Sequence, residues 1–210
     1  DQMDKTLQIL SGEIEDPDRP ILIIAGHIHI DHTYLGLCDR RLRALGRILL
    51  VAEAGGAEHL KAGDQYWTGA DVVEVPVPKT PVDILLSFSG YSSPGIMSRI
   101  CLPGVYHLGL ITLYFSHLGS GYPGLSLHSD GPDPIEFWHT PGHCDDSMTI
   151  RIGSLFHIGD IPFSINPGIA GRPGYDRDSL IRSVCGIRYL FEHNGGMICC
   201  PGHGRALNRQ

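Results

Sequence analysis

The sequence predicts a single α/β domain over residues 1–210. Short apolar runs typical of strands alternate with stretches whose apolar residues recur at helical spacing. The 210 residues, of which 42% are hydrophobic and 19% charged, suffice for one substantial core and are few for two. No internal repeat or low-complexity tract divides the sequence. We therefore expect one domain with mixed secondary structure.

The first part of the chain predicts strands around one helix. TLQIL (6–10) and ILIIAG (21–26) have strand character and are joined by the polar turn SGEIEDPDRP. CDRRLRALGRILL (38–50) predicts a helix with an arginine-rich outer face, and ILLVAE (48–53) returns to strand character. ADVVEVPVP (70–78) alternates like a further strand. The expected order is strand, histidine-rich loop, helix and strand.

Residues 81–123 form an irregular segment rich in Gly, Pro, Tyr and Leu, which we interpret as an insertion over one face of the fold. Within it, residues 100–116 are uncharged and apolar, but Pro103, Gly104 and His107 interrupt the run, which is also short for a bilayer span. We expect a buried or pocket-lining segment and no transmembrane segment. The alternatives are a homodimer contact through 81–123 or a membrane-surface patch.

The last part of the chain is patterned more sharply. IEFWH (135–139), SMTIRIG (147–153) and LFHIGD (155–160) predict strands. DRDSLIRSVCGIRYLFEHN (176–194) predicts an amphipathic helix, and GMICCPGHG (196–204) predicts a final strand that ends at a histidine.

Histidines and aspartates follow four of these strands. HIHIDH (27–32) comes directly after ILIIAG, and the others are His143 in TPGHCDDS, Asp160 in HIGDIPF and His203 in CCPGHGR. Strand ends at one edge of a sheet can bring such side chains together, and a metal ion offsets the free-energy cost of desolvating them. His27 and His29 alternate along an extended segment and suit one ion, while Asp31 and His32 can face a second.

This set resembles the metallo-β-lactamase superfamily through its HxHxDH motif, later His, later Asp and final His, over about residues 6–205. The resemblance implies a four-layer αβ/βα sandwich, here with a shortened N-terminal half and the insertion near 81–123. It also implies two divalent metal ions, zinc first, with iron or manganese as alternatives. The implied ligands are His27, His29 and His143 for the first ion, Asp31, His32 and His203 for the second, and Asp160 as the bridge.

The resemblance further implies a hydrolase that uses a metal-bridging hydroxide, with Asp31 as the catalytic residue that would orient the hydroxide and take its proton as the intermediate collapses. A bridging Asp160 is typical of glyoxalase-II-like thioesterases, lactonases, phosphodiesterases and diiron proteins, and it disfavours a β-lactamase. We expect a small-molecule ester, thioester or lactone as substrate. The alternatives are a phosphodiesterase, an iron-dependent redox protein (sulfur dioxygenase or diiron oxygen-binding protein) and a non-catalytic metal-binding module. Candidate substrate contacts are Phe163, Tyr91, Tyr106 and Arg205.

Charge and cysteine content bear on partners and compartment. The net charge of −7 makes nucleic acid an unlikely partner. The six cysteines form no CxxC pair and no disulfide framework, and DQMDKTLQIL is not patterned like a signal peptide, so we expect a cytoplasmic protein. We interpret Cys144 as a small buried thiol. For Asp145 and Asp146, two interpretations stay open: hydrogen bonds to the ligand histidines, or exposure to solvent in a turn. His157 has no ligand spacing.

Overall fold

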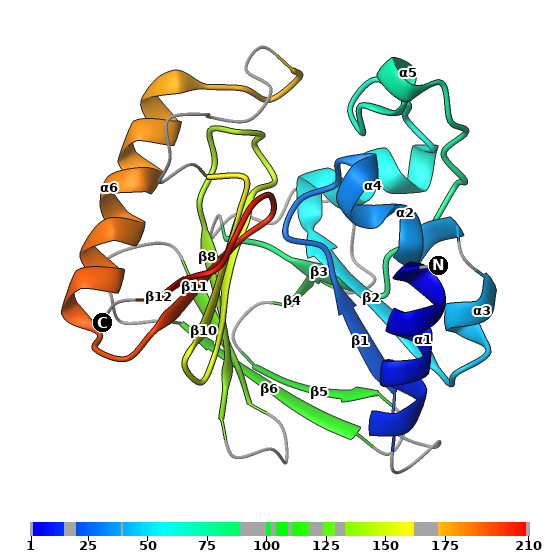
Figure 1. The fold of residues 1–210 in the computed structure, drawn as a ribbon, viewed down its shortest axis with the longest axis horizontal. Coiled ribbons are helices and arrows are strands. Elements are labelled where there is room, and N and C mark those ends of the chain that lie inside the picture. The colour runs from blue at the N-terminus through cyan, green and yellow to red at the C-terminus, as the bar shows by residue number, and fades with distance from the viewer. Residues whose placement is uncertain are drawn as a thin grey trace.

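In the computed structural model, the described strands form two sheets that face each other, with helices on both outer sides (Figure 1). Helix α6 covers one outer side, and the helices of the first half cover the other. The order of layers is therefore helices, sheet, sheet and helix, as expected. The structure describes residues 2–14, 20–38, 40–88, 100–101, 104–108, 111–117, 124–128, 133–161 and 172–208.

The first sheet is parallel in all its described pairs and has the order β1-β2-β3-β4. Its strands are β1 (Ile21–Ile24), β2 (Ile48–Glu53), β3 (Ile84–Leu86) and β4 (Ile100–Cys101). The helices near it are α1 (Gln2–Glu13), α2 (Ile30–Cys38), α3 (Arg40–Arg43), α4 (Ala54–Ala62) and α5 (Ala70–Val73).

The second sheet has the described order β12-β11-β10-β9-β8-β7-β6-β5. All of its described pairs are antiparallel except β10 with β11, which are parallel. The strands are β5 (Gly104–Leu108), β6 (Ile111–His117), β7 (Gly124–His128), β8 (Ile135–His139), β9 (Met148–Ile152), β10 (Leu155–Gly159), β11 (Ile198–Pro201) and β12 (Leu207–Asn208). Helix α6 spans Arg177–His193.

Strand alternation divides the apolar residues between the layers. In β2, Val51 faces the second sheet, whereas Leu50 and Ala52 on the opposite face pack toward the helices. The cluster between the sheets consists of Val51, Ile84, Leu86, Leu125, Leu127, Phe137, Met148 and Ile150. On the far side, α6 buries Leu180 and Ile187 against Trp138 and Phe156. The strands and helix expected over 135–204 are confirmed.

Two expected strands in the first half are wrong. Residues 6–10 lie in α1, where Ile9 is 65% exposed, because a short apolar run does not by itself distinguish a strand from a helix face. Residues 70–73 form α5, and Pro76 and Pro78 that follow lack the N–H donors of a central strand. Within the helix expected over 38–50, the structure has the four-residue α3. A separate helix, α2, begins at Ile30 where a loop was expected, so Asp31 and His32 lie in its first turn.

The segment 81–123 is not an insertion over the fold, because it supplies β3 and β4 to the first sheet and β5 and β6 to the second. β4 ends at Cys101 and β5 begins at Gly104, and residues 104–108 pair with 111–115 as antiparallel strands. None of the described helices is long and apolar enough to cross a membrane. A homodimer contact through this segment stays a prediction.

Candidate metal centre

Strand direction brings the predicted ligands to one edge of the fold. β8, β10 and β11 run in the same direction, so the residues that follow them, His143, Asp160 and His203, emerge at the same edge. His27 follows β1 of the other sheet, and a hydrogen bond from Met148 N–H to Gly26 C=O (2.7 Å) ties that strand end to β9. Nitrogen and oxygen atoms of all seven predicted ligands fall into three overlapping groups, each within 4.8 Å: His27, His29 and His143; His27, His32 and Asp160; Asp31, His32 and His203.

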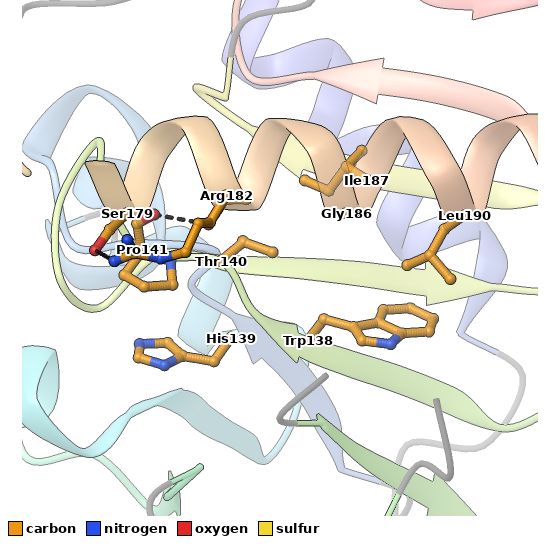
Figure 2. Close-up of a pocket in the computed structure, with 10 residues that line it drawn as sticks. Trp138, His139, Thr140, Pro141, Ser179, Arg182, Gly186, Ile187 and Leu190 are labelled. Atoms are coloured by element: carbon orange, nitrogen blue, oxygen red, sulfur yellow. Dashed lines mark hydrogen bonds between the residues drawn. The ribbon is translucent and has the colours of Figure 1, made fainter. Parts of the chain in front are cut away.

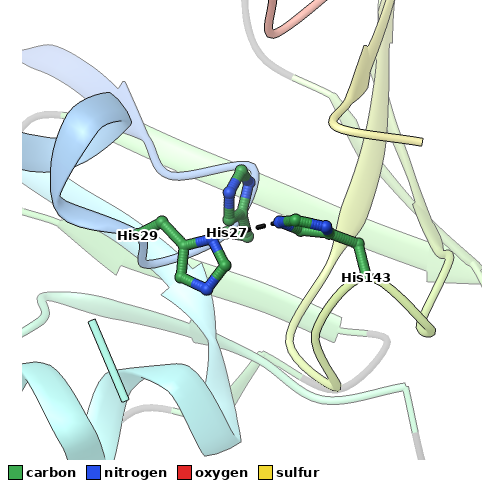
Figure 3. Close-up of side chains that lie close together, drawn as sticks. All are labelled: His27, His29 and His143. Atoms are coloured by element: carbon green, nitrogen blue, oxygen red, sulfur yellow. Dashed lines mark hydrogen bonds between the residues drawn. The ribbon is translucent and has the colours of Figure 1, made fainter. Parts of the chain in front are cut away.

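The first group is a buried cluster of three imidazoles. His27, His29 and His143 are 3%, 8% and 5% exposed, and Figure 3 shows their rings pointing toward one another from two separate segments. Nδ1 of His29 lies 3.1 Å from Nε2 of His143. Two nitrogen ligands of one tetrahedral zinc ion would lie about 3.3 Å apart. Nε2 of His27 is buried and has no hydrogen-bond partner among the described residues, so this donor is free for an ion.

The second group lies at the open side of the site. His203 is exposed, Asp31 is exposed and His32 is half-buried. Nε2 of His203 lies 3.2 Å from Oδ2 of Asp31, and Nε2 of His32 lies 3.5 Å from the same oxygen. Asp31 and His32 are held at the start of α2, where Thr33 N–H and its hydroxyl both donate to the carbonyl of His29 (3.1 and 3.0 Å). Solvent and a substrate would therefore reach this group first.

Asp160 lies between the two groups. Its Oδ2 atom is 3.6 Å from Nε2 of His143 and 3.9 Å from Nε2 of His27. The same oxygen is 3.3 Å from Nε2 of His32 and 3.5 Å from Nε2 of His203. One carboxylate thus contacts imidazoles of both groups, which is the arrangement that a ligand shared by two ions requires.

Burial and charge set the protonation states of these residues. Burial, with neighbouring imidazoles, lowers the pKa of His27 well below its usual value and that of His29 to about 4. Burial also lowers the pKa of His143. Burial would raise the pKa of Asp160, but the hydrogen bond with His32 and the adjacent imidazoles hold it well below its usual range. Neutral imidazoles around an ionised carboxylate are the forms that bind a cation, so the donor set fits a pair of divalent ions.

His32 differs from the other histidines of the site. Burial lowers its pKa, but the hydrogen bond and charge of Asp160 and the charge of Asp31 outweigh burial, so its pKa is raised. Without a cation, His32 therefore balances the two carboxylates that flank it. A bound cation would displace the proton that gives His32 its positive charge.

The sequence left Asp146 open between a hydrogen bond to a ligand histidine and solvent exposure, and it indicated no role for His157. Asp146 is 3% exposed, and burial raises its pKa to about 7, whereas Asp145 is exposed. Burial also lowers the pKa of His157, which is close enough to His32 and Asp160 to feel their charges. His157 lies on β10, three residues before Asp160, which follows that strand, and this position was the one available signal. Cys144 is a buried thiol, as interpreted, 3.0 Å from Ser147 Oγ.

The structure describes only some of the predicted substrate contacts. Tyr91 and Phe163 lie outside the described residues, and for Tyr106 the structure describes the backbone in β5 and not the side chain. Arg205 is exposed, two residues after His203.

An apolar cavity of about 240 Å³ lies between α6 and the end of β8 (Figure 2). Ser183 on α6 closes one side by donating a hydrogen bond to the carbonyl of Pro141 (2.8 Å). None of the seven predicted ligands lines the cavity, although Pro141 belongs to the loop that carries His143. The lining residues are Trp138, His139, Thr140, Pro141, Ser179, Arg182, Ser183, Gly186, Ile187 and Leu190.

Solved structures share this architecture over nearly the whole chain. The structure of BLEG-1 B3 metallo-beta-lactamase aligns with 98% of this chain and 78% of its own, at 17% identity and a TM-score of 0.61. TTHA1623 in a di-iron-bound form aligns with 98% of this chain and 79% of its own, at 18% identity and a TM-score of 0.56. No protein-family model and no curated protein matches the sequence. At these identities, the likeness is one of fold.

Proposed function

The chain has the metallo-β-lactamase fold, and from this premise we propose that it is a hydrolase that depends on two divalent metal ions, with zinc as the first candidate. The observation that carries the proposal is the position of Asp160, whose Oδ2 lies 3.3–3.9 Å from Nε2 atoms of four histidines. Two of these, His27 and His143, belong to the buried group, and His32 and His203 belong to the open group.

In this proposal, His27, His29 and His143 hold the first ion, while Asp31, His32 and His203 hold the second. Asp160 contributes to both. Two buried groups support this assignment: the unpartnered Nε2 of His27, and the carboxylate of Asp160, whose pKa lies well below its usual range. Both groups are costly to bury without a cation. Iron or manganese would be accepted by the same donors.

When bound, the ions supply an activated water as nucleophile and polarise the scissile bond of the substrate. The residues of the chain would accept a proton and exclude water. Oδ2 of Asp31, on the open side of the site, can accept the proton of the attacking water and orient it. The buried imidazoles of the first group exclude bulk water from the inner side of the reaction centre. We propose Asp31 as the catalytic residue on this basis.

We propose a small-molecule ester, thioester or lactone as the substrate, with Phe163, Tyr91, Tyr106 and Arg205 as candidate contacts. The exposed position of Arg205 near His203 would suit an anionic group on such a molecule.

An iron-dependent redox protein is the second candidate. The supporting observation is that TTHA1623, which has the same fold, was solved in a di-iron-bound form. His and Asp ligands serve iron as well as zinc, so the identity of the metal decides between the two functions.

The test is elemental analysis of protein purified without added metal or chelator, followed by turnover assays. Near two zinc ions per chain, with turnover of a thioester, lactone or ester, supports the hydrolase. Turnover of phosphodiesters alone would contradict the proposed substrate class. Iron as the main metal, with an iron absorption band, moves the function to the second candidate. No metal even after reconstitution contradicts both, and metal without turnover of any substrate makes the protein a binding module.

A suitable control separates the site from general metal binding. Asp160→Asn should lose the metal, whereas Asp133→Asn, an exposed carboxylate before β8, should keep it.

A further inference from the structure

The segment that carries His27 and His29 is held by hydrogen bonds along its backbone. Ala25 N–H donates to Val51 C=O (2.9 Å), Gly26 C=O accepts from Met148 N–H (2.7 Å) and Ile30 N–H donates to Thr68 C=O (2.8 Å). The N–H of Ile28, between the two histidines, faces the carboxylate of Asp146 closely enough to lower the pKa of that carboxyl. The contact at Ile28 N–H uses a side chain, as does the hydrogen bond from the Thr33 hydroxyl to the Ile28 carbonyl (3.3 Å), so each can be removed by mutation without altering a backbone.

Asp146 belongs to the loop of the third histidine, His143. Its carboxylate lies close to the thiol of Cys144 and against the start of α4. A β-carbon at Gly56 would lie 2.5 Å from Oδ2 and 2.9 Å from Cγ of Asp146. Only glycine therefore leaves room for this carboxylate, which packs against the loop of His143, the His27–His29 segment and α4.

We propose that Asp146 is a positioning residue, which fixes the backbone of Ile28 and thereby sets His27 and His29 against His143 for the first metal ion. The proposal rests on the proposed function. Ile28 has little freedom on its other side, because its side chain is 2% exposed and packs with Leu50 and Leu60. With both sides anchored, the two flanking imidazoles are presented at a defined spacing, and metal geometry tolerates little error in that spacing.

The burial of Asp146 is costly and therefore informative. Burial, together with the charges of Glu53 and Asp145, raises the pKa of this carboxyl to about 7. Its Oδ2 has no hydrogen-bond partner among the described residues. A buried carboxylate placed beside two others is unfavourable for folding, and such local conflicts are typical of residues that serve a site.

The experiment measures zinc affinity by competition with a chromophoric chelator, together with zinc content per chain. Asp146→Ala should weaken binding of the first zinc ion about 10- to 100-fold, the usual cost of losing a residue that orients a ligand. Asp146→Asn keeps an oxygen acceptor for Ile28 N–H and should restore most of the affinity. Asp145→Ala, an exposed carboxylate in the same loop, is the matched control and should bind zinc like the wild type.

A second variant and a second readout cover the case in which Asp146→Ala does not fold. Gly56→Ala leaves the carboxylate in the chain but forces it away, so it should also weaken zinc binding and speed hydrogen exchange of the Ile28 amide. Wild-type affinity and unchanged Ile28 exchange in folded Gly56→Ala or Asp146→Ala protein would overturn the proposal. If the wild type itself binds no metal, the proposed function fails, while exchange at Ile28 still decides whether Asp146 positions this segment.

Discussion

Gly202 lies directly against the carboxylate of Asp160, at the ends of the neighbouring strands β11 and β10. The N–H of Gly202 donates to the carbonyl of Gly159 (2.7 Å), which brings the two strand ends together. A β-carbon at position 202 would overlap Oδ1 of Asp160 and approach Cε1 of His32 to 3.0 Å. The glycine of the PGHG motif therefore makes room for the residue that joins the two halves of the site.

Gly202→Ala should displace Asp160 and lower the metal content, because neither the backbone of β10 nor the packed histidines can give way easily. We expect at least a tenfold loss of zinc affinity, in the range found when ligand orientation is disturbed. Elemental analysis with chelator competition measures it. Gly195→Ala, where a β-carbon meets nothing within 4 Å, is the control. Full zinc occupancy in Gly202→Ala would show that Asp160 is not needed at its present position.

The two ligand groups should respond differently to mutation. Asp160→Asn removes the charge next to four imidazoles, so we expect loss of both ions. His203→Ala removes an exposed ligand from the open group and should leave one ion on the buried histidines. The metal content per chain is measured for each variant after dialysis against metal-free buffer. It distinguishes two bound ions from one bound ion and from none. Equal occupancy in both variants would contradict the division into two groups.

Removal of the metal should lower thermal stability. The buried imidazoles have unpartnered donors, and an ion that binds only the folded state stabilises it by about 2.7 kcal/mol at a hundredfold excess over Kd. Melting temperature, measured before and after chelation and again after zinc is restored, tests this. Asp160→Asn should melt at the same temperature in all three conditions. A wild type that is equally insensitive to chelation would argue against a metal in the buried group.

The stability of the metal-free protein should depend on pH through Asp146. Its pKa in the folded state is about 7, against an ordinary value of 3.8, so the folded state holds its proton more strongly. The stability that this proton contributes is complete below about pH 4 and is lost as the pH rises toward 7, by at most ~1.4 kcal/mol per pH unit. Urea unfolding of wild type and Asp146→Asn across this range measures the difference. The advantage of the Asn variant should grow from pH 4 to 7 and level off above. A constant difference would show that Asp146 ionises normally.

Much of the second half could be read from local pattern. The alternation in IEFWH and SMTIRIG and the helical spacing over 176–194 matched β8, β9 and α6, because each segment buries one face in a nearby core. Local pattern predicted the strands of the first half less accurately. TLQIL became part of α1, and the strands within 81–123 were missed, since short strands take their pairing from partners far along the chain.

The sequence by itself determined the candidate donor residues, their order and their positions after strands, because a histidine or aspartate that follows an apolar run is a local feature. The tertiary structure decided that Oδ2 of Asp160 lies near imidazoles of both groups, that Gly202 leaves room for it and that Asp146 is buried while Asp145 is exposed. These features depend on strand direction and on the packing of two sheets against each other. They arise from contacts between separate segments of the chain, as between His29 and His143, which no local pattern encodes.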